Sequence, residues 1–169
     1  EACLMTNDST KFFRPELYDR ITVAAGPWLE LACREALASA LSGGGPFGAV
    51  VVQFDRESNA PLRHWVGRNR VTPDCDPTAH AEMVALRAAC RDLGVFHLGD
   101  ITAADGEPDP AGRPYYCVIY SSCEPCPMCY AAIRWARIPE LVFAATRFDA
   151  SVPGVDFADA AIYDDFEHD

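Results

Sequence analysis

The chain has 169 residues, half of them hydrophobic, and 25 acidic residues outnumber 14 basic ones for a formal net charge of −11. This length suits one domain with its own core, and the negative charge argues against a nucleic-acid partner, because proteins that grip phosphates carry basic faces. No stretch has the roughly 18–20 apolar residues of a membrane helix, and residues 1–14 lack the apolar run of a signal peptide. We therefore expect a cytoplasmic protein that binds no membrane and takes a small neutral ligand.

The first half of the chain predicts one helix followed by two strands. Residues 1–27 are polar or mixed and form an N-terminal extension to a domain over residues 28–169. Leucines among alanines predict a helix over residues 28–41, begun by Pro27 and stopped by three glycines. The apolar, β-branched run 47–54 is typical of a buried strand, and residues 63–69 predict a strand paired with it.

The second half alternates helices with strands. Residues 72–77 are rich in proline and predict a loop. A helix is expected over residues 79–90, capped by Asp76 or Thr78. After a surface loop at 105–114, the pattern predicts a strand, a short helix and a further strand, over residues 115–120, 126–136 and 141–146. An acidic tail follows at 149–169. This order predicts an α/β domain of three layers, with helices on both faces of one sheet.

The sequence has eight cysteines, and two kinds of surroundings stand out among them. Disulfides are not expected in a protein without a signal peptide and with a core of this size. Cys33, Cys90 and Cys117 lie in apolar surroundings, which predicts that they are buried small hydrophobic residues. Cys126 and Cys129 differ, because this spacing on a helical turn lets two sulfurs bind one tetrahedral ion. A structural zinc knuckle or a redox dithiol would show the same spacing.

A histidine and a carboxylate precede this cysteine pair at the start of the other predicted helix. His80-x-Glu82 alone occurs often by chance, but with Pro-Cys126-x-x-Cys129 it matches the H-x-E and P-C-x-x-C pattern of zinc deaminases that act on nucleobases. Three protein ligands leave one position for water, as in catalytic rather than structural zinc sites. We therefore predict one zinc ion per subunit, held by His80, Cys126 and Cys129, with Glu82 as the proton shuttle.

From about residue 44 to 163 the chain resembles the cytidine deaminase-like superfamily, and within it the guanine deaminases. The resemblance is densest in G-P-F-G-A-V, D-P-T-A-H-A-E and S-C-E-P-C-P-M-C, at residues 45–50, 76–82 and 122–129, and continues through 132–137. It implies a three-layer α/β/α fold with a central mixed sheet of about five strands, and a homodimer. The chain departs from the pattern in a longer N-terminus and an extra segment around 105–113.

The resemblance also implies residues that bind the substrate. Phe47 would stack on a purine ring, Asn69 would hydrogen-bond to that ring, and Trp135 would wall the pocket. An acidic residue of the tail would meet the guanine edge, with Asp159 as the first choice and Asp156 as the second. Plainer interpretations exist, with Phe47 as core, Trp135 as helix packing and Asp159 as one more charge on an acidic tail.

These observations predict zinc-dependent hydrolysis of guanine to xanthine and ammonia. Guanosine, cytosine, triazines and pterins carry similar exocyclic amines and are alternative substrates. A deaminase acting on adenosine in tRNA shares the zinc motif but needs an electropositive surface, against which the net charge of −11 argues. A non-catalytic module stabilised by zinc is a third alternative. Glu82 argues against it, since a structural site has no use for a proton shuttle.

Overall fold

The structure, a computed structural model, describes residues 25–99, 114–151 and 162. The helices are α1 (Pro27–Leu41), α2 (Val71–Asp74), α3 (Ala81–Leu93) and α4 (Pro127–Trp135), with a short 3-10 turn, η4 (Asp149–Ser151). The strands are β1 (Gly48–Asp55), β2 (Pro61–Arg68), β3 (Tyr115–Cys123) and β4 (Glu140–Ala145). None of the helices in this part of the chain combines the length and the apolar character needed to cross a membrane.

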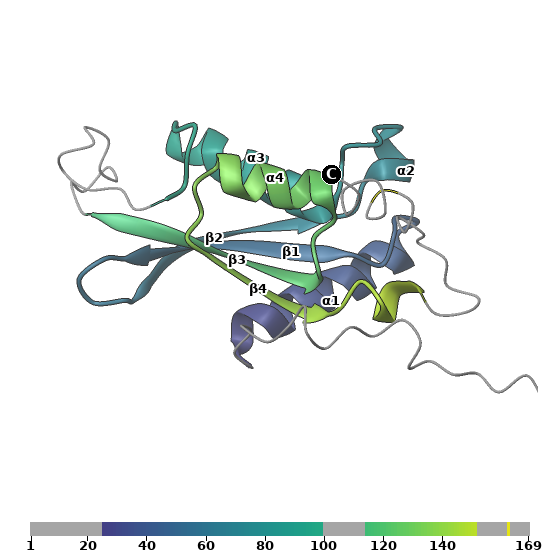
Figure 1. Cartoon of the computed structure of the whole chain (residues 1–169), viewed down its shortest axis with the longest axis horizontal. Coiled ribbons are helices and arrows are strands. Elements are labelled where there is room, and N and C mark those ends of the chain that lie inside the picture. The colour runs from purple at the N-terminus through teal and green to yellow at the C-terminus, as the bar shows by residue number, and fades with distance from the viewer. Residues whose placement is uncertain (1–24, 100–113, 152–161, 163–169) are drawn as a thin grey trace, which may run out of the picture.

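The four strands form one mixed sheet in the order β2-β1-β3-β4. Strand β1 pairs antiparallel with β2 and with β3, and β3 pairs parallel with β4. Helix α1 covers one face of the sheet, and α3 and α4 cover the other (Figure 1). The predicted three-layer α/β/α arrangement is confirmed, with four strands of the mixed sheet lying within the described residues.

Strand β1 lies at the centre of the sheet and is buried on both faces. Ala49 and Val51 pack into the core beneath α3 and α4, whereas Val50 and Val52 pack against α1. All four side chains are fully buried, and burial of one valine contributes about 1.5–3 kcal/mol to folding. The continuous apolar run that predicted a buried strand therefore reflects helices on both sides of it.

Helix α1 buries one narrow stripe of small residues against the sheet. Ala32, Ala36 and Ser39 form this stripe, and Gly48 lets the helix approach closely, because a Cβ at that position would overlap the backbone of Ala32 and Ala36. Cys33 lies beside the stripe and is exposed. The prediction that Cys33 is buried is thus wrong, since a surface helix buries only one face. Cys117 is buried, as predicted.

The loop predicted over residues 72–77 contains one helical turn, α2, and that prediction is wrong. Pro73 belongs to the first turn of α2, where a missing backbone N–H breaks no intrahelical hydrogen bond. The turn ends at Cys75, whose backbone is left-handed with a φ of 51°. Pro73 therefore lies in the first turn of a helix, whereas the proline-rich pattern of residues 72–77 had been interpreted as excluding one.

The predicted capping of α3 by Asp76 or Thr78 is also wrong. Oδ1 of Asp76 instead accepts hydrogen bonds from the backbone N–H and the hydroxyl of Thr78, at 2.8 and 2.7 Å. These bonds close the turn that leads into α3. The N-cap residue is His80, whose side chain makes no capping hydrogen bond. His80 thus occupies the N-cap position, where a side chain that caps the helix is usual.

The pairing register places the starts of α3 and α4 at the same end of the sheet. Arg68, the last residue of β2, pairs with Gly48, and Ser121, near the end of β3, pairs with the adjacent Ala49. The segments that follow β2 and β3 therefore leave the sheet beside each other, and these segments lead into α3 and α4. Ligand sites of α/β sheets commonly form outside the carboxyl ends of strands in this way.

Candidate metal centre

Two helix starts supply three metal-binding side chains. His80 is the N-cap residue of α3, and its carbonyl oxygen accepts the backbone N–H of Val84 at 3.0 Å. Cys126 has the same position in α4 and accepts the backbone N–H of Tyr130 at 2.8 Å. Both N-cap residues have extended backbones, and Cys129 follows in the first turn of α4. Each ligand is therefore tied to a rigid element.

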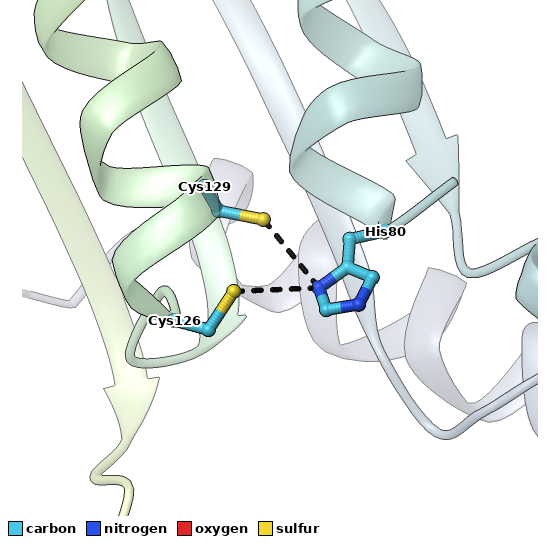
Figure 2. A group of neighbouring side chains, drawn as sticks. All are labelled: His80, Cys126 and Cys129. Carbon is cyan, nitrogen blue, oxygen red and sulfur yellow. Dashed lines mark hydrogen bonds between the residues drawn. The ribbon is translucent and has the colours of Figure 1, made fainter. Parts of the chain in front are cut away.

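The three side chains converge on one point between the helices. Figure 2 shows the imidazole of His80, from the start of α3, facing the two sulfurs from the start of α4. Nδ1 of His80 lies 3.5 Å from Sγ of Cys126 and 3.5 Å from Sγ of Cys129. A tetrahedral zinc ion, about 2.0–2.1 Å from nitrogen and about 2.3 Å from sulfur, requires nitrogen-to-sulfur separations of about 3.5 Å. The three residues therefore fit Zn²⁺.

The ligand set is that of a metal site with one open position. The nitrogen and the two sulfurs lie within 4.8 Å of one another, and in the described parts of the chain no fourth His, Cys, Asp or Glu joins this group. Structural zinc sites are closed by four protein ligands, whereas catalytic sites keep a position for water or substrate. The donor set thus favours catalytic zinc over a structural knuckle.

The electrostatics of the two thiols favour a cation. The pKa of Cys126 is lowered to about 4, chiefly by a hydrogen bond with Cys129 and also by one with His80. The same hydrogen bond and burial raise the pKa of Cys129. Together these shifts place one negative charge on the pair at neutral pH. Metal ions bind thiolates, so zinc binding would release the remaining proton from Cys129.

Glu82 is the second residue of α3 and is buried beside the ligands, with 6% of its surface exposed. Its Oε1 accepts a hydrogen bond from the hydroxyl of Ser121 at 3.1 Å, and its Oε2 accepts one from the thiol of Cys129 at 3.5 Å. Burial raises the pKa of the Glu82 carboxyl, and the negative charge of Cys126 raises it further. Such a shift suits a group that exchanges protons near neutral pH.

Phe47 and Asn69 lie together at the same end of the sheet. The backbone N–H of Asn69 donates to the carbonyl oxygen of Phe47 at 3.1 Å. Oδ1 of Asn69 accepts the backbone N–H groups of Gly45 and Val71, at 3.3 and 3.2 Å. Because both partners are donors, the contacted atom is the amide oxygen. Among the described residues no acceptor pairs with Nδ2 of Asn69, which leaves this amide as a donor for a ligand.

An open hollow of about 300 Å³ lies beside Phe47, on the side of the sheet covered by α1. It is lined by Cys33, Ala36, Pro46, Phe47, Ser122, Cys123, Ala145, Asp149 and Ala150. None of the three metal-binding residues lines it, and neither does Glu82. This hollow is therefore not lined by the groups that would carry the chemistry.

The remaining predicted substrate contacts are not brought together with the metal centre in the described chain. Trp135 is the last residue of α4, six positions after Cys129, which is roughly 9 Å further along the helix axis. Its side chain is 84% exposed, so a pocket wall at Trp135 stays a prediction. Asp156 and Asp159 lie outside the described residues.

Sequence reasoning missed Ser121, which contacts Glu82 directly. The buried face of β3 carries Tyr115, Cys117 and Ile119 at alternate positions, and Ser121 continues this series. A single hydroxyl among apolar residues on a buried face is a signal that could have identified it, because buried hydroxyls need a hydrogen-bond partner.

Comparison with known families agrees with this site. The sequence profile described as the cytidine and deoxycytidylate deaminase zinc-binding region matches residues 26–145. The matched range includes the three metal-binding residues and Glu82, together with Phe47, Asn69 and Trp135. The two candidate acids of the tail lie beyond it.

The individual relatives include a guanine deaminase and tRNA-specific adenosine deaminases. Guanine deaminase of Bacillus subtilis is 42% identical over 124 residues, which cover 73% of this chain and 64% of that protein. Its X-ray structure has a TM-score of 0.62 at 40% identity, covering 81% of this chain and 73% of that one. A tRNA-specific adenosine deaminase of Aquifex aeolicus is 34% identical over 118 residues, or 70% of this chain and 64% of that protein. The chain thus spans less than two thirds of these curated relatives.

Proposed function

The chain belongs to the cytidine and deoxycytidylate deaminase family defined by this zinc-binding region, and from this premise we propose that it catalyses hydrolytic deamination of guanine to xanthine and ammonia. The observation that carries the proposal is the buried carboxylate of Glu82, whose Oε2 lies 3.5 Å from Sγ of a zinc ligand, Cys129. A purely structural zinc site has no use for such a group.

His80, Cys126 and Cys129 would hold the metal. Zn²⁺ bound there supplies Lewis acidity, which lowers the pKa of water from about 15.7 toward 7. The two helix starts contribute to holding it, because the positive ends of α3 and α4 stabilise thiolates near them.

Glu82 moves the protons of the reaction. Its Oε2 takes a proton from the attacking water and delivers it to N3 of the ring, while the water oxygen forms a bond to C2. The carboxylate then takes the remaining proton of the added hydroxyl and passes it to the exocyclic nitrogen, so that the C2–N bond breaks, the C2 carbonyl of xanthine forms and ammonia leaves. General acid–base help of this kind is worth about 10²- to 10⁴-fold in rate.

The base is proposed to bind between Phe47 and Asn69. The aromatic ring of Phe47 supports stacking, and Nδ2 of Asn69 can donate to an acceptor atom of the ring, since Oδ1 is held by two backbone N–H groups. Asp159, or Asp156 in its place, is proposed to meet the amino edge of guanine, and Trp135 to wall the pocket. The similarity to a guanine deaminase at 42% identity supports guanine over the tRNA substrate of relatives at 34%, and so does the net charge of −11.

We also propose that the protein works as a homodimer in the cytoplasm. Helix α4 exposes Tyr130 by 52% and Trp135 by 84%, and aromatic residues are enriched at interfaces. All seven cysteines among the described residues are free thiols, which suits a reducing compartment. Light scattering coupled to gel filtration tests the dimer, and a monomeric mass at micromolar concentration would contradict it.

The test of the proposed activity is ammonia release by the zinc-loaded protein, offered guanine, guanosine, cytosine and adenine side by side. We expect turnover of guanine, and in Glu82→Gln a loss of about 10²- to 10⁴-fold with zinc retained. An active Glu82→Gln variant would refute the role of this carboxyl. Turnover of another amine but not of guanine would support deaminase activity and exclude guanine as the substrate. Salt-sensitive release of ammonia from a tRNA anticodon stem would favour the tRNA reaction.

A further inference from the structure

We propose that Ser121 is a positioning residue for the reaction, and that its hydroxyl fixes which carboxylate oxygen of Glu82 carries the proton. This inference rests on the proposed deaminase function. It starts from one contact, the hydrogen bond from Oγ of Ser121 to Oε1 of Glu82 at 3.1 Å, which joins residues 39 positions apart.

Ser121 is fixed in the interior of the sheet. It lies in β3 between two neighbouring strands, paired with Ala49 of β1 and with Phe143 of β4. Its side chain is 2% exposed and lies on the face of β3 that packs beneath α3. A hydroxyl at this place keeps its position while side chains nearer to the solvent move.

The two oxygens of Glu82 have different surroundings. Oε1 faces Ser121, and Oε2 faces Sγ of Cys129. The terminal torsion of a glutamate side chain is broad, so the carboxylate needs a fixed partner to keep this orientation. Cys129 no longer donates a hydrogen bond once it binds a metal as thiolate. Among the described residues, Ser121 is then the side chain that still donates to Glu82, beside the backbone N–H of Glu82 itself, which belongs to the mobile residue's own turn and does not tie the carboxylate to the sheet.

This arrangement assigns separate tasks to the two oxygens. Oε1 is the anchored atom, and Oε2, which lies beside a metal ligand, is the atom that exchanges protons with water and with the base. Without the hydroxyl of Ser121 the carboxylate rotates, and Oε2 leaves its place for part of the time. A misplacement of about 1 Å can cost about 10²-fold in rate. Ser121 is too deeply buried to contact a base, so substrate binding should change little.

The experiment compares Ser121→Thr, which keeps the hydroxyl, with Ser121→Val, which has nearly the same shape without it. Ser121→Ala removes the hydroxyl without adding volume and covers the case in which valine does not fit. We expect kcat for guanine to fall about 10- to 100-fold in the Ala and Val variants, with KM within about 2-fold of the parent. The Thr variant should stay within about 3-fold of the parent in kcat. Zinc content, measured on the same preparations, should be one zinc per chain in every variant. The thermal midpoint of each preparation shows whether the variant is folded.

A second readout does not depend on turnover. Crystal structures of the zinc-loaded Thr and Val variants should show Oε2 of Glu82 in place in the first and a rotated or split carboxylate in the second. If the Ala and Val variants keep the parent kcat with full zinc, the positioning role is wrong. If the parent protein turns over none of the amines, the proposed function fails. The two crystal structures then test the role of Ser121 by themselves. An unmoved Glu82 carboxylate in the Val variant would overturn the inference.

Discussion

Gly67 of β2 lies directly against Ala81, the first residue of α3. A Cβ at residue 67 would overlap the carbonyl oxygen of Ala81 and would lie 2.7 Å from the backbone nitrogen of Ala85. The absence of a side chain at Gly67 therefore sets the distance between the sheet and the start of α3. His80 and Glu82, which flank Ala81 in sequence, take their places from this contact.

Gly67→Ala should displace the start of α3 and loosen the metal centre with it. We expect a loss of about 1–3 kcal/mol in the free energy of unfolding, because extra volume is forced against backbone atoms, together with weaker zinc binding. Denaturant unfolding and zinc titration with a competing chelator measure the two effects. Gly26→Ala is the matched control. A Cβ at residue 26 meets nothing within 4 Å, so its cost should stay under about 1 kcal/mol. Equal behaviour of the two variants would contradict this account.

Cys126→Ser should lose both zinc and the stability that zinc provides. A ligand present at 100 times its Kd stabilises the folded state by about 2.7 kcal/mol, so adding a strong chelator should lower the Tm of the parent. The Tm of Cys126→Ser should not respond to the chelator. Cys33→Ser is the control, since Cys33 is exposed on α1 and is not among the residues that could hold the metal. It should bind one zinc per chain, and a loss of zinc in this control would argue against the assigned ligands.

Substitutions of Asn69 should separate its structural task from substrate binding. Asn69→Ala leaves the backbone N–H groups of Gly45 and Val71 without their acceptor, which should cost about 1–3 kcal/mol. Asn69→Asp keeps both acceptor bonds but removes the Nδ2 donor. It should unfold close to the parent while its KM for the base rises at least 10-fold. An unchanged KM in Asn69→Asp would show that Nδ2 does not bind the substrate.

Stability should fall in alkaline solution because of a buried thiol. Burial raises the pKa of Cys117 from 9.0 to about 12. Above pH 9 the unfolded chain has released this proton while the folded chain keeps it until about pH 12, so rising pH favours unfolding across this window. The loss approaches about 1.4 kcal/mol per pH unit.

The contribution of Cys117 is isolated by comparing the parent with Cys117→Ala at pH 8, 9, 10 and 10.5. Unfolding by urea in saturating zinc is used for both proteins, so that the other thiols contribute equally to the two unfolding free energies. The difference in unfolding free energy between the two should shrink as the pH rises. A constant difference over this range would mean that Cys117 titrates near its ordinary pKa in the folded protein.

Local patterns in the sequence predicted most of the fold and the metal site. The continuous apolar run of β1 indicated a buried strand, and Pro27, which is the first residue of α1, indicated where that helix begins. The ligands were predictable because His-x-Glu and Cys-x-x-Cys place their side chains through one helical turn each. Those relationships span few residues and depend little on the rest of the chain.

Relationships set by tertiary structure were not predictable in the same way. The contact between Ser121 and Glu82 depends on strand register and helix placement, which no local pattern specifies. Cys33 was expected to be buried because its neighbours are apolar, but the stripe that α1 buries passes beside it. The helical turn α2 was missed because proline was taken to end structure, although proline is tolerated in a first helical turn.

The metal centre joins two segments that are 46 residues apart, from His80 to Cys126. A zinc ion at this point would act as a cross-link that closes a long loop, and the entropy of closing such a loop depends only on the logarithm of its length. Doubling the connection between α3 and β3 would cost only about 0.6 kcal/mol. The sheet and the two helix starts set the geometry of the ligands. Lengthening the chain between these two segments should therefore change the affinity for zinc little, provided that Leu98, which is buried and hydrogen-bonds to Ala136 and Cys117, keeps its place.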